Sequence, residues 1–315
     1  MAENMKLQRL RCLCTIVDEG FNISRAARML HTSQPGVSKQ IRLLEQELKA
    51  DILMRRGGRI SGLTAPGTAV LAIARQMVRD SENLRRIGED FADHDSGRLI
   101  LATTHLHARY VLLHVVENFR TRYPAVQLVL RQGSPNQIFQ LVATGEADIG
   151  ISNEVAAGTP ALLELACGKM ARSVVVRRGH PLTRVRRLTL KHIARYPLIT
   201  LDRLSPGGRA VARAFALGGL EPKIVMQAID TDVAKAYVEL GLGIAIMPAV
   251  AVDARRDSNL TAIDATRVFG AGTMSIAIDP RSYLRTYMYD FIRMLSPAWT
   301  RERVNAALRM PAARE

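Results

Sequence analysis

The chain has 315 residues, of which 48% are hydrophobic, and it carries a formal net charge of +15 with a pI near 10.4. A chain of this length can bury more than one core, so two or three domains are expected. No apolar run approaches the roughly 20 residues that a membrane span needs, and the first residues lack a signal-peptide pattern. We therefore expect a cytoplasmic protein without a membrane partner. The basic excess favours a polyanion, although charge alone equally suits RNA or a membrane surface.

Residues 24–48 predict a helix, a tight turn and a second helix. Small apolar residues on the first helix, among them Ala26 and Ala27, form a face where another helix can approach closely. Thr32 or Ser33 can cap the second helix, because both hydroxyls suit the N-cap position. This is the pattern of a helix-turn-helix motif.

The second predicted helix has a polar, basic outer face that fits the major groove of DNA. Its Gln and Ser side chains can meet base edges, and its cations can meet phosphates. An ordinary amphipathic helix pair with a solvated face would show much of the same pattern. The residues predicted to contact DNA here are Ser24, Thr32, Ser33, Gln34, Pro35, Ser38, Lys39 and Arg42.

A basic hairpin is predicted over residues 52–64, as two short extended runs joined by a Gly-Gly turn. Arg55, Arg56 and Arg59 lie at its tip and complete the predicted DNA contacts. Up to Leu63 the chain carries eleven Lys and Arg against six Asp and Glu. A basic hairpin beside a recognition helix indicates a winged helix-turn-helix that binds double-stranded DNA.

These motifs resemble the LysR-type transcriptional regulators. The resemblance rests on the helix at 7–17, on SQPGVSKQI at 33–41 and on LTAPG at 63–67. Further along, the segments 102–110, 132–138 and 285–292 are similar to the CysB subfamily of sulfur-metabolism regulators. The resemblance therefore covers nearly the whole chain. It implies regulation of genes for sulfur assimilation or for sulfonate or cysteine metabolism.

Residues 64–92 predict one long helix with an apolar stripe that a lone helix cannot hide. The resemblance implies antiparallel pairing with a second copy, which gives a homodimer or homotetramer, whereas packing within one chain is the alternative. Two-fold symmetry would place the recognition helices about one DNA turn, roughly 34 Å, or a multiple of it apart. We expect a DNA-binding domain at 1–63, this linker helix, a hinge at 93–97 and an effector domain at 98–315.

From residue 98 the predicted strands and helices alternate in two series, which indicates an α/β fold. The resemblance implies a two-lobed, periplasmic-binding-protein-like effector domain. Lobe I would comprise about 98–167 and 265–315, with a short amphipathic helix at 300–309, and lobe II would comprise about 168–264. The expected strands are at 99–103, 126–131, 148–152, 173–176, 198–200, 223–228 and 243–247, and the expected helices at 111–123, at 134–144, from about 208 and from 231.

Ligands of such folds bind between the lobes, at strand ends and helix N-termini. Hydroxyls and main-chain N–H groups that gather there would stabilise an anion. Helix capping alone would also explain Ser134 and Thr231. The predicted effector-binding residues are Thr103, Thr104, His105, His107, Gly133, Ser134, Asn153, Thr200 and Asp202.

The chain departs from the CysB pattern at several of these positions. Leu106 and His107 replace a Thr-Gln pair, Asn153 stands where the subfamily has threonine, and Pro206 precedes Gly-Gly-Arg in place of Thr-Gly-Arg. The predicted effector is therefore a small anionic or sulfur-containing molecule, but not necessarily sulfate or acetylserine. A protonated His107 could hold an anion near neutral pH.

The sequence gives weaker support to other functions. Cys12, Cys14 and Cys167 form neither a disulfide framework nor a zinc spacing, so packing is favoured, with a redox or thiol-ligand role open for Cys167. His105, His107 and His114 lack a third metal ligand in sequence, and no Walker loop, nucleophile elbow or HExxH motif occurs. We expect no enzyme, cofactor or metal. A transport binding protein shares the two-lobed fold, but it would lack the DNA-binding domain; RNA polymerase is an expected partner.

Overall fold

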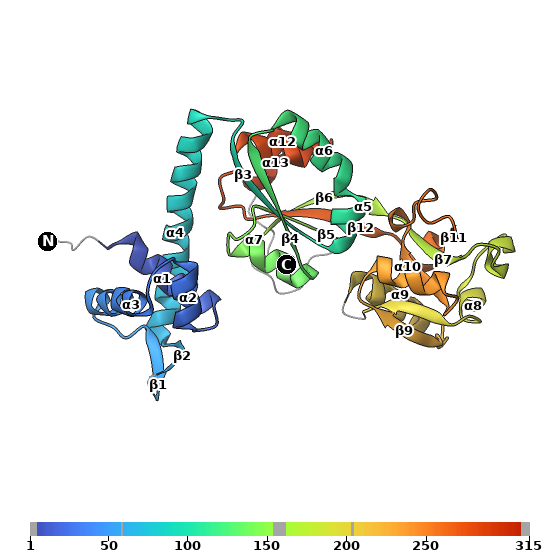
Figure 1. The fold of residues 1–315 in the computed structure, drawn as a ribbon, viewed down its shortest axis with the longest axis horizontal. Helices are drawn as coiled ribbons and strands as arrows, with labels where there is room; N and C mark the ends of the chain where they lie inside the picture. The colour runs from blue at the N-terminus through green and yellow to red at the C-terminus, as the bar shows by residue number, and fades with distance from the viewer. Residues whose placement is uncertain (1–4, 58, 154–161, 203–204, 310–315) are drawn as a thin grey trace. The chain divides into compact units, whose positions relative to one another are not determined.

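The computed structural model describes residues 5–57, 59–153, 162–202 and 205–309 (Figure 1). The chain divides into two compact units. The first comprises Met1–Ala92 together with Arg281–Tyr283, and the second comprises Asp93–Pro280 together with Leu284–Glu315. Within the described residues, no helix combines the length and the apolar character that a membrane crossing requires.

The first unit is a helical domain with a two-stranded wing. Helices α2 and α3 begin at side-chain caps: Asn22 accepts a hydrogen bond from Arg25 N–H, and Ser33 accepts one from Gly36 N–H. Helix α3 ends where Lys49 adopts a left-handed conformation with φ of 50°. The elements are α1 (Leu7–Asp18), α2 (Ile23–Met29), α3 (Gln34–Leu48), β1 (Leu53–Arg56), β2 (Arg59–Leu63) and α4 (Ala65–Ala92).

One hydrophobic core joins α1, α2, α3 and the first turns of α4. Leu13, Val37 and Leu44 are fully buried in it, and the small Ala26 lets α2 approach its neighbours closely. Cys12 and Cys14 are free cysteines buried in the same core. Both cysteines therefore have the packing role that the sequence favoured.

The second unit begins with a five-stranded mixed sheet, ordered β4-β3-β5-β12-β6. Alternate residues of β3 face opposite sides: Leu101 joins a core with α6, α12 and α13, whereas Ala102 packs against α7. Residues from both ends of the unit therefore build this first lobe. Its elements are β3 (Gly97–Thr103), β4 (Val126–Gln132), β5 (Ile149–Ser152), β6 (Leu163–Met170), β12 (Gly272–Ile278), α6 (Leu112–Arg122), α7 (Pro135–Ala143), α12 (Thr286–Leu295) and α13 (Arg301–Arg309).

The second lobe repeats this plan with the sheet order β11-β7-β10-β8-β9. Val174 and Val176 of β7 face a core with α8, α9 and α11, whereas Val175 faces α10. Figure 1 shows α9 and α10 beside this sheet. The elements are β7 (Arg172–Arg177), β8 (Leu198–Leu201), β9 (Ile224–Ala228), β10 (Ile244–Pro248), β11 (Leu260–Asp264), α8 (Leu190–Ile193), α9 (Pro206–Leu217), α10 (Thr231–Glu239) and α11 (Thr266–Phe269), with the 3-10 turns η1 (Pro181–Arg184) and η2 (Ala249–Ala251).

The chain passes between the two sheets twice. It leaves the first sheet after Met170 and enters the second at Arg172, slightly later than the sequence suggested. It returns only after α11, because Phe269 is buried in the core of the second lobe. The helix α5 (His105–Tyr110) follows β3 of the first lobe, yet its Leu106 and Tyr110 pack against the core of the second. Helix α5 therefore joins the lobes.

Candidate DNA-binding and effector-binding sites

Helix α3 exposes the polar face that the sequence predicted. Gln34, Lys39 and Arg42 are exposed, and Ser38 is half-buried. Ser33 is the N-cap of α3, with its Oγ 3.2 Å from Gly36 N. Of the two predicted cap residues, Thr32 and Ser33, it is therefore Ser33 that caps the helix. The remaining predicted residues of this motif, Ser24, Thr32 and Pro35, are exposed around the start of the helix.

The wing is attached to α3 through a buried carboxylate. Glu45 Oε1 accepts hydrogen bonds from the main-chain N–H groups of Ile52 and Leu53, at 3.1 and 3.2 Å. Its Oε2 accepts from Arg55 Nη2 at 2.9 Å. Arg56 is exposed on the same strand, and the side chain of Arg59 lies outside the described residues. Arg55 of the wing therefore has an intramolecular partner, Glu45.

The candidate effector site lies where parallel strands end together. Thr103, Gln132 and Ile151 are aligned in neighbouring strands of the first lobe, so the residues that follow β3, β4 and β5 meet at one edge. In the second lobe, Leu201 of β8 is aligned with Ala228 of β9, which brings Asp202 and Asp230 to the facing edge. The sheet register therefore places both edges on one cavity.

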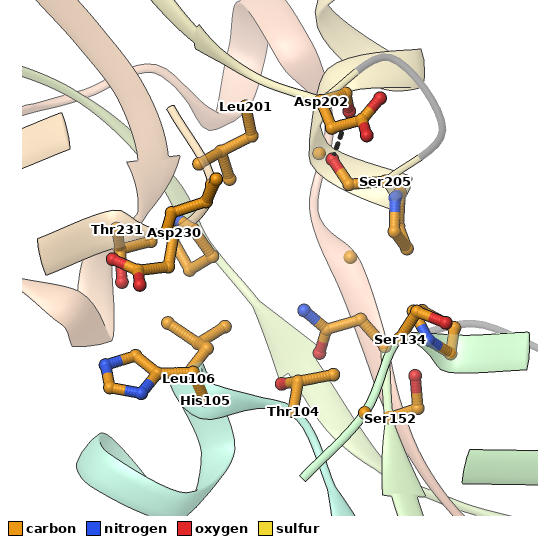
Figure 2. Close-up of a pocket in the computed structure, with 18 of the residues that line it drawn as sticks. Thr104, His105, Leu106, Ser134, Ser152, Leu201, Asp202, Ser205, Asp230 and Thr231 are labelled. Carbon is orange, nitrogen blue, oxygen red and sulfur yellow. Dashed lines mark hydrogen bonds between the residues drawn. The ribbon is translucent and has the colours of Figure 1, made fainter. Parts of the chain in front are cut away.

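This cavity has a volume of about 750 Å³ and is lined from both lobes (Figure 2). Six of the predicted effector-binding residues line it, namely Thr104, His105, Gly133, Ser134, Asn153 and Asp202. Figure 2 shows Ser134 and Ser152 on one side of the open space and Asp230 and Thr231 on the other. Ser134 also forms a complete capping box with Gln137, so lining the cavity and capping α7 are both its roles.

Three predicted residues do not line the cavity. Thr103 is buried and its hydroxyl donates to the carbonyl of Ile151 at 3.2 Å, which ties β3 to β5. Thr200 is buried within β8. His107 is fully buried, with 0% of its surface exposed. Each lies next to, or one helical turn away from, a residue that does line the cavity. The sequence alone does not show which of two such neighbours faces the cavity.

The expectation that His107 supplies a titratable charge is wrong. Burial lowers the pKa of His107 from 6.5 to about 4, although a hydrogen bond with Asn153 acts in the opposite direction. Its ring is therefore neutral at physiological pH. His107 Nδ1 lies 2.7 Å from Thr104 Oγ1, and Nε2 lies 2.8 Å from Asn153 Oδ1.

Asp232 connects α5 and α10 through a network of charged and polar side chains. Its carboxylate contacts His105 Nε2 at 2.6 Å and Arg109 Nε at 3.1 Å, and it accepts a hydrogen bond from Tyr110. Lys235 Nζ, which is nearly buried, contacts Asp232 at 3.4 Å and Tyr110 Oη at 2.8 Å. Burial acts to raise the pKa of Asp232, but the hydrogen bonds and cations around it leave that pKa below its usual value.

Oxygen and nitrogen atoms of His105, Asp230 and Asp232 lie within 4.8 Å of one another, a spacing that could suit a cation. Asp232, however, already contacts Arg109 and Lys235. Two neighbouring cations disfavour a third, so the arrangement fits an ionic link between the lobes better than a metal site. His114 lies elsewhere, exposed and 3.7 Å from Glu117.

Sequence reasoning missed two charged residues of the cavity. Arg172, which is nearly buried, lines it and donates to the carbonyl of Phe269 at 2.6 Å. Asp230 lines it as the N-cap of α10, with Oδ1 accepting from Val233 N–H at 2.9 Å. The acidic residue directly before the predicted helix was the available signal for Asp230, because aspartate is a favoured N-cap.

Two hydroxyls of the cavity lining are buried without a hydrogen-bond partner among the described residues. They are Ser152 Oγ at the end of β5 and Thr231 Oγ1 at the start of α10. Their residues are only 2% and 3% exposed. An unpaired buried hydroxyl costs free energy, so a ligand that supplies partners would gain affinity from both.

Cys167 does not line this cavity. It packs against the core of the first lobe with Sγ 3.3 Å from the carbonyl of Leu165. Burial raises the pKa of the Cys167 thiol to about 11, which suppresses the reactive thiolate. The structure therefore favours packing over a redox role.

The winged helix-turn-helix and the two-lobed cavity define a ligand-responsive DNA-binding protein. The model of the LysR-family bacterial regulatory helix-turn-helix protein matches residues 7–68, and the LysR substrate binding domain matches residues 92–300. The chain belongs to the LysR family. It is accordingly a transcriptional regulator that binds DNA, and not an enzyme.

Two relatives from Burkholderia cenocepacia match almost end to end. The chain is 45% identical to the HTH-type transcriptional regulator SsuR over 305 residues, which cover 97% of this chain and 99% of the relative. It is 41% identical to the HTH-type transcriptional regulator CysB over 305 residues, which cover 97% of each. These matches confirm the CysB-like resemblance.

Solved structures agree with the fold. The cofactor-binding domain of the Cbl transcriptional regulator is similar with a TM-score of 0.65 and 36% identity, over 69% of this chain and 95% of that domain. Full-length OxyR from Pseudomonas aeruginosa is similar over 98% of this chain and 96% of its own, with a TM-score of 0.70 and 19% identity. The OxyR likeness concerns the fold alone.

Proposed function

We propose that this regulator controls genes of sulfur assimilation or of sulfonate or cysteine metabolism in the cytoplasm, and that a small oxyanion or organosulfur effector gates it. The observation that carries the proposal is the cavity itself. It joins the N-termini of α7 and α9, a nearly buried arginine and the Ser152 hydroxyl, which has no hydrogen-bond partner in the part of the chain that the structure describes. Helix N-termini, hydroxyls and an arginine side chain all stabilise an anion.

Gating follows if the effector binds one arrangement of the lobes more tightly than another, because equal binding to both would shift nothing. Helix α5 is the element through which this works, since it borders the cavity at His105 and Leu106, contacts α6 of the first lobe and packs against the core of the second. A changed lobe arrangement would alter how a homodimer or homotetramer presents its winged domains to promoter DNA and to RNA polymerase.

The first experiment is a mobility shift of the full chain on DNA upstream of its own gene and of neighbouring sulfur-assimilation genes. Random duplex serves as competitor, and sulfate, thiosulfate, alkanesulfonates and acetylserine are added in turn. Specific binding that one sulfur compound alters supports the proposal. Specific binding that no sulfur compound alters overturns the effector class, and no specific binding overturns the choice of target genes.

A LysR regulator of another pathway is the second candidate. The observation that favours it is the loss of subfamily side chains from the cavity lining at Leu106, Asn153 and Pro206. In the same mobility shift, this candidate predicts specific binding upstream of its own gene without any response to the sulfur compounds.

A further inference from the structure

His107 is buried between two residues that line the effector cavity. Thr104 lies on one side of the ring and Asn153 on the other, at the hydrogen-bond distances given above. His107 itself does not border the cavity. It can therefore influence a ligand only through these two neighbours.

The atoms in contact determine the direction of both hydrogen bonds. An amide oxygen only accepts, so His107 Nε2 carries the ring proton and donates to Asn153 Oδ1. A neutral imidazole has one proton, which leaves Nδ1 as an acceptor for the hydroxyl proton of Thr104. Thr104 Oγ1 also accepts the N-cap hydrogen bond from the His107 main-chain N–H, so it has no proton to give to a ligand and offers one remaining lone pair. The Asn153 amide nitrogen remains a donor.

The N-terminal caps of the helices that line the cavity differ in the same sense. Serine residues cap the helices α7 and α9, whereas Asp230 caps α10. The Asp230 carboxylate opposes the attraction of its helix N-terminus for an anion and accepts hydrogen bonds instead. An oxyanion is thus favoured beside Ser134 and Ser152, and a hydrogen-bond donor is favoured beside Asp230 (Figure 2).

We propose that His107 is the specificity-determining positioning residue of the cavity and that the effector carries a hydroxyl or ammonium donor in addition to its oxyanion. The inference rests on the proposed function and names the effector's class. Thr104 and Asp230 accept from that donor, while Asn153 and the hydroxyl of Ser152 donate to the oxyanion. The cavity of about 750 Å³ has room for such an organic molecule.

The inference also explains why two departures from the CysB pattern occur together. A histidine at 107 needs an acceptor for its Nε2 proton, and Asn153 supplies one at a position where the subfamily has threonine. The pair removes Thr104 as a donor. A bare tetraoxyanion such as sulfate, which has only acceptors at neutral pH, would meet an acceptor there.

Calorimetry on the full chain at pH 7 tests the ligand class with ethanesulfonate, 2-hydroxyethanesulfonate and 2-aminoethanesulfonate, which differ only in the donor. We expect at least one of the two donor-bearing sulfonates to bind about tenfold or more tightly than ethanesulfonate, because a buried acceptor left unpaired is costly. Equal affinities, or a preference for ethanesulfonate or sulfate, overturn the inference. If the mobility shift responds to sulfate alone, the proposed function stands and the inference fails.

His107→Gln tests the positioning role, because the glutamine amide can take the place of Nε2 beside Asn153 but has no acceptor at the position of Nδ1, which leaves the Thr104 hydroxyl free to donate. The preference for the donor-bearing sulfonate should fall to within about threefold, with a gain in affinity for ethanesulfonate. Thr104→Ser, which retains the hydroxyl, serves as the matched control and should keep the preference. A merely structural histidine would instead lower the affinity for every sulfonate equally.

The tautomer of the His107 ring can be measured without a ligand. In histidine-labelled protein, long-range proton–nitrogen correlation spectra should show Nε2 of His107 protonated and Nδ1 unprotonated at pH 7. The His107→Gln variant assigns the signals by their loss. A proton on Nδ1 would make Thr104 a donor toward the cavity and would overturn the inference, whatever the mobility shift reports.

Discussion

Arg55 in the wing is paired with Glu45 in the recognition helix, with Nη2 of the arginine 2.9 Å from Oε2 of the glutamate. The other carboxylate oxygen binds the first main-chain N–H groups of the wing. Glu45 therefore fixes where the wing begins relative to α3. Arg55, which the sequence predicted as a DNA contact, has this structural partner in the free protein.

Replacement of Glu45 by alanine should destabilise the first unit. The change leaves the N–H groups of Ile52 and Leu53 buried without their acceptor, at a cost of about 2–3 kcal/mol in the free energy of unfolding. Urea denaturation followed by circular dichroism measures it. Glu45→Gln, which keeps an acceptor oxygen, is the control and should lose less than half as much. Equal losses in both variants would indicate that the charge alone matters.

Arg56→Ala should weaken binding to all duplex DNA and reduce the slope of log K against log salt by about 1. Arg56 is exposed, so its removal costs little stability. Fluorescence anisotropy on operator and random duplex over a salt series provides the measurement. Arg55→Ala should weaken binding as well, but it also frees Glu45 and should lower stability. An unchanged salt slope for Arg56→Ala would rule out a phosphate contact.

Gln34→Ala should lower the preference for the operator by about 1–3 kcal/mol and leave random-duplex binding nearly unchanged. Gln34 is exposed at the start of α3, where its Oε1 lies 3.3 Å from Ser24 Oγ. Ser38→Ala should act in the same direction. Lys39→Ala is the comparison, since a phosphate contact weakens both DNAs together. If all three variants lose affinity equally for the operator and for random duplex, the assignment of Gln34 and Ser38 to base contacts and of Lys39 to a phosphate contact is wrong.

Leu84→Glu should prevent self-association. Leu84 is 72% exposed on α4, in line with the exposed Ile73, Met77 and Phe91. A charge placed in such an apolar stripe opposes pairing with a second copy, whereas it disturbs no core. Sedimentation velocity measures the oligomeric state. Ala72→Glu introduces the same charge at an exposed position of α4 away from the stripe and should leave assembly intact.

Stability should fall as the pH is lowered from about 6.5 to about 4. The unfolded histidine takes up a proton near 6.5, whereas the folded His107 takes one up only near its pKa of about 4. In that window the unfolded chain binds the extra proton, so unfolding is favoured, by about 3 kcal/mol over the whole range. Chemical denaturation at a series of pH values measures it. His107→Gln should lose this part of the pH dependence, and identical curves would contradict a buried neutral ring.

Much of the fold could be predicted because the local signals were strong. The cap at Ser33, the proline in the first turn and the apolar stripe of α3 agree with one another and with the helix observed. The strands β6, β11 and β12 were not predicted. Strand β12 pairs with β5 and β6 from far earlier in the chain, and such long-range pairing has no local signature.

The sequence by itself determined the class of the protein, since spacing, capping residues and charge identify a winged helix-turn-helix before two α/β lobes. Strand ends also indicated six residues of the cavity lining, because parallel strands end at one edge. Only the tertiary structure decided that His107 is buried and neutral, that Arg55 is paired with Glu45 and that Arg172 reaches the cavity. Burial and hydrogen-bond partners depend on residues far apart in the chain, so no local pattern contains them.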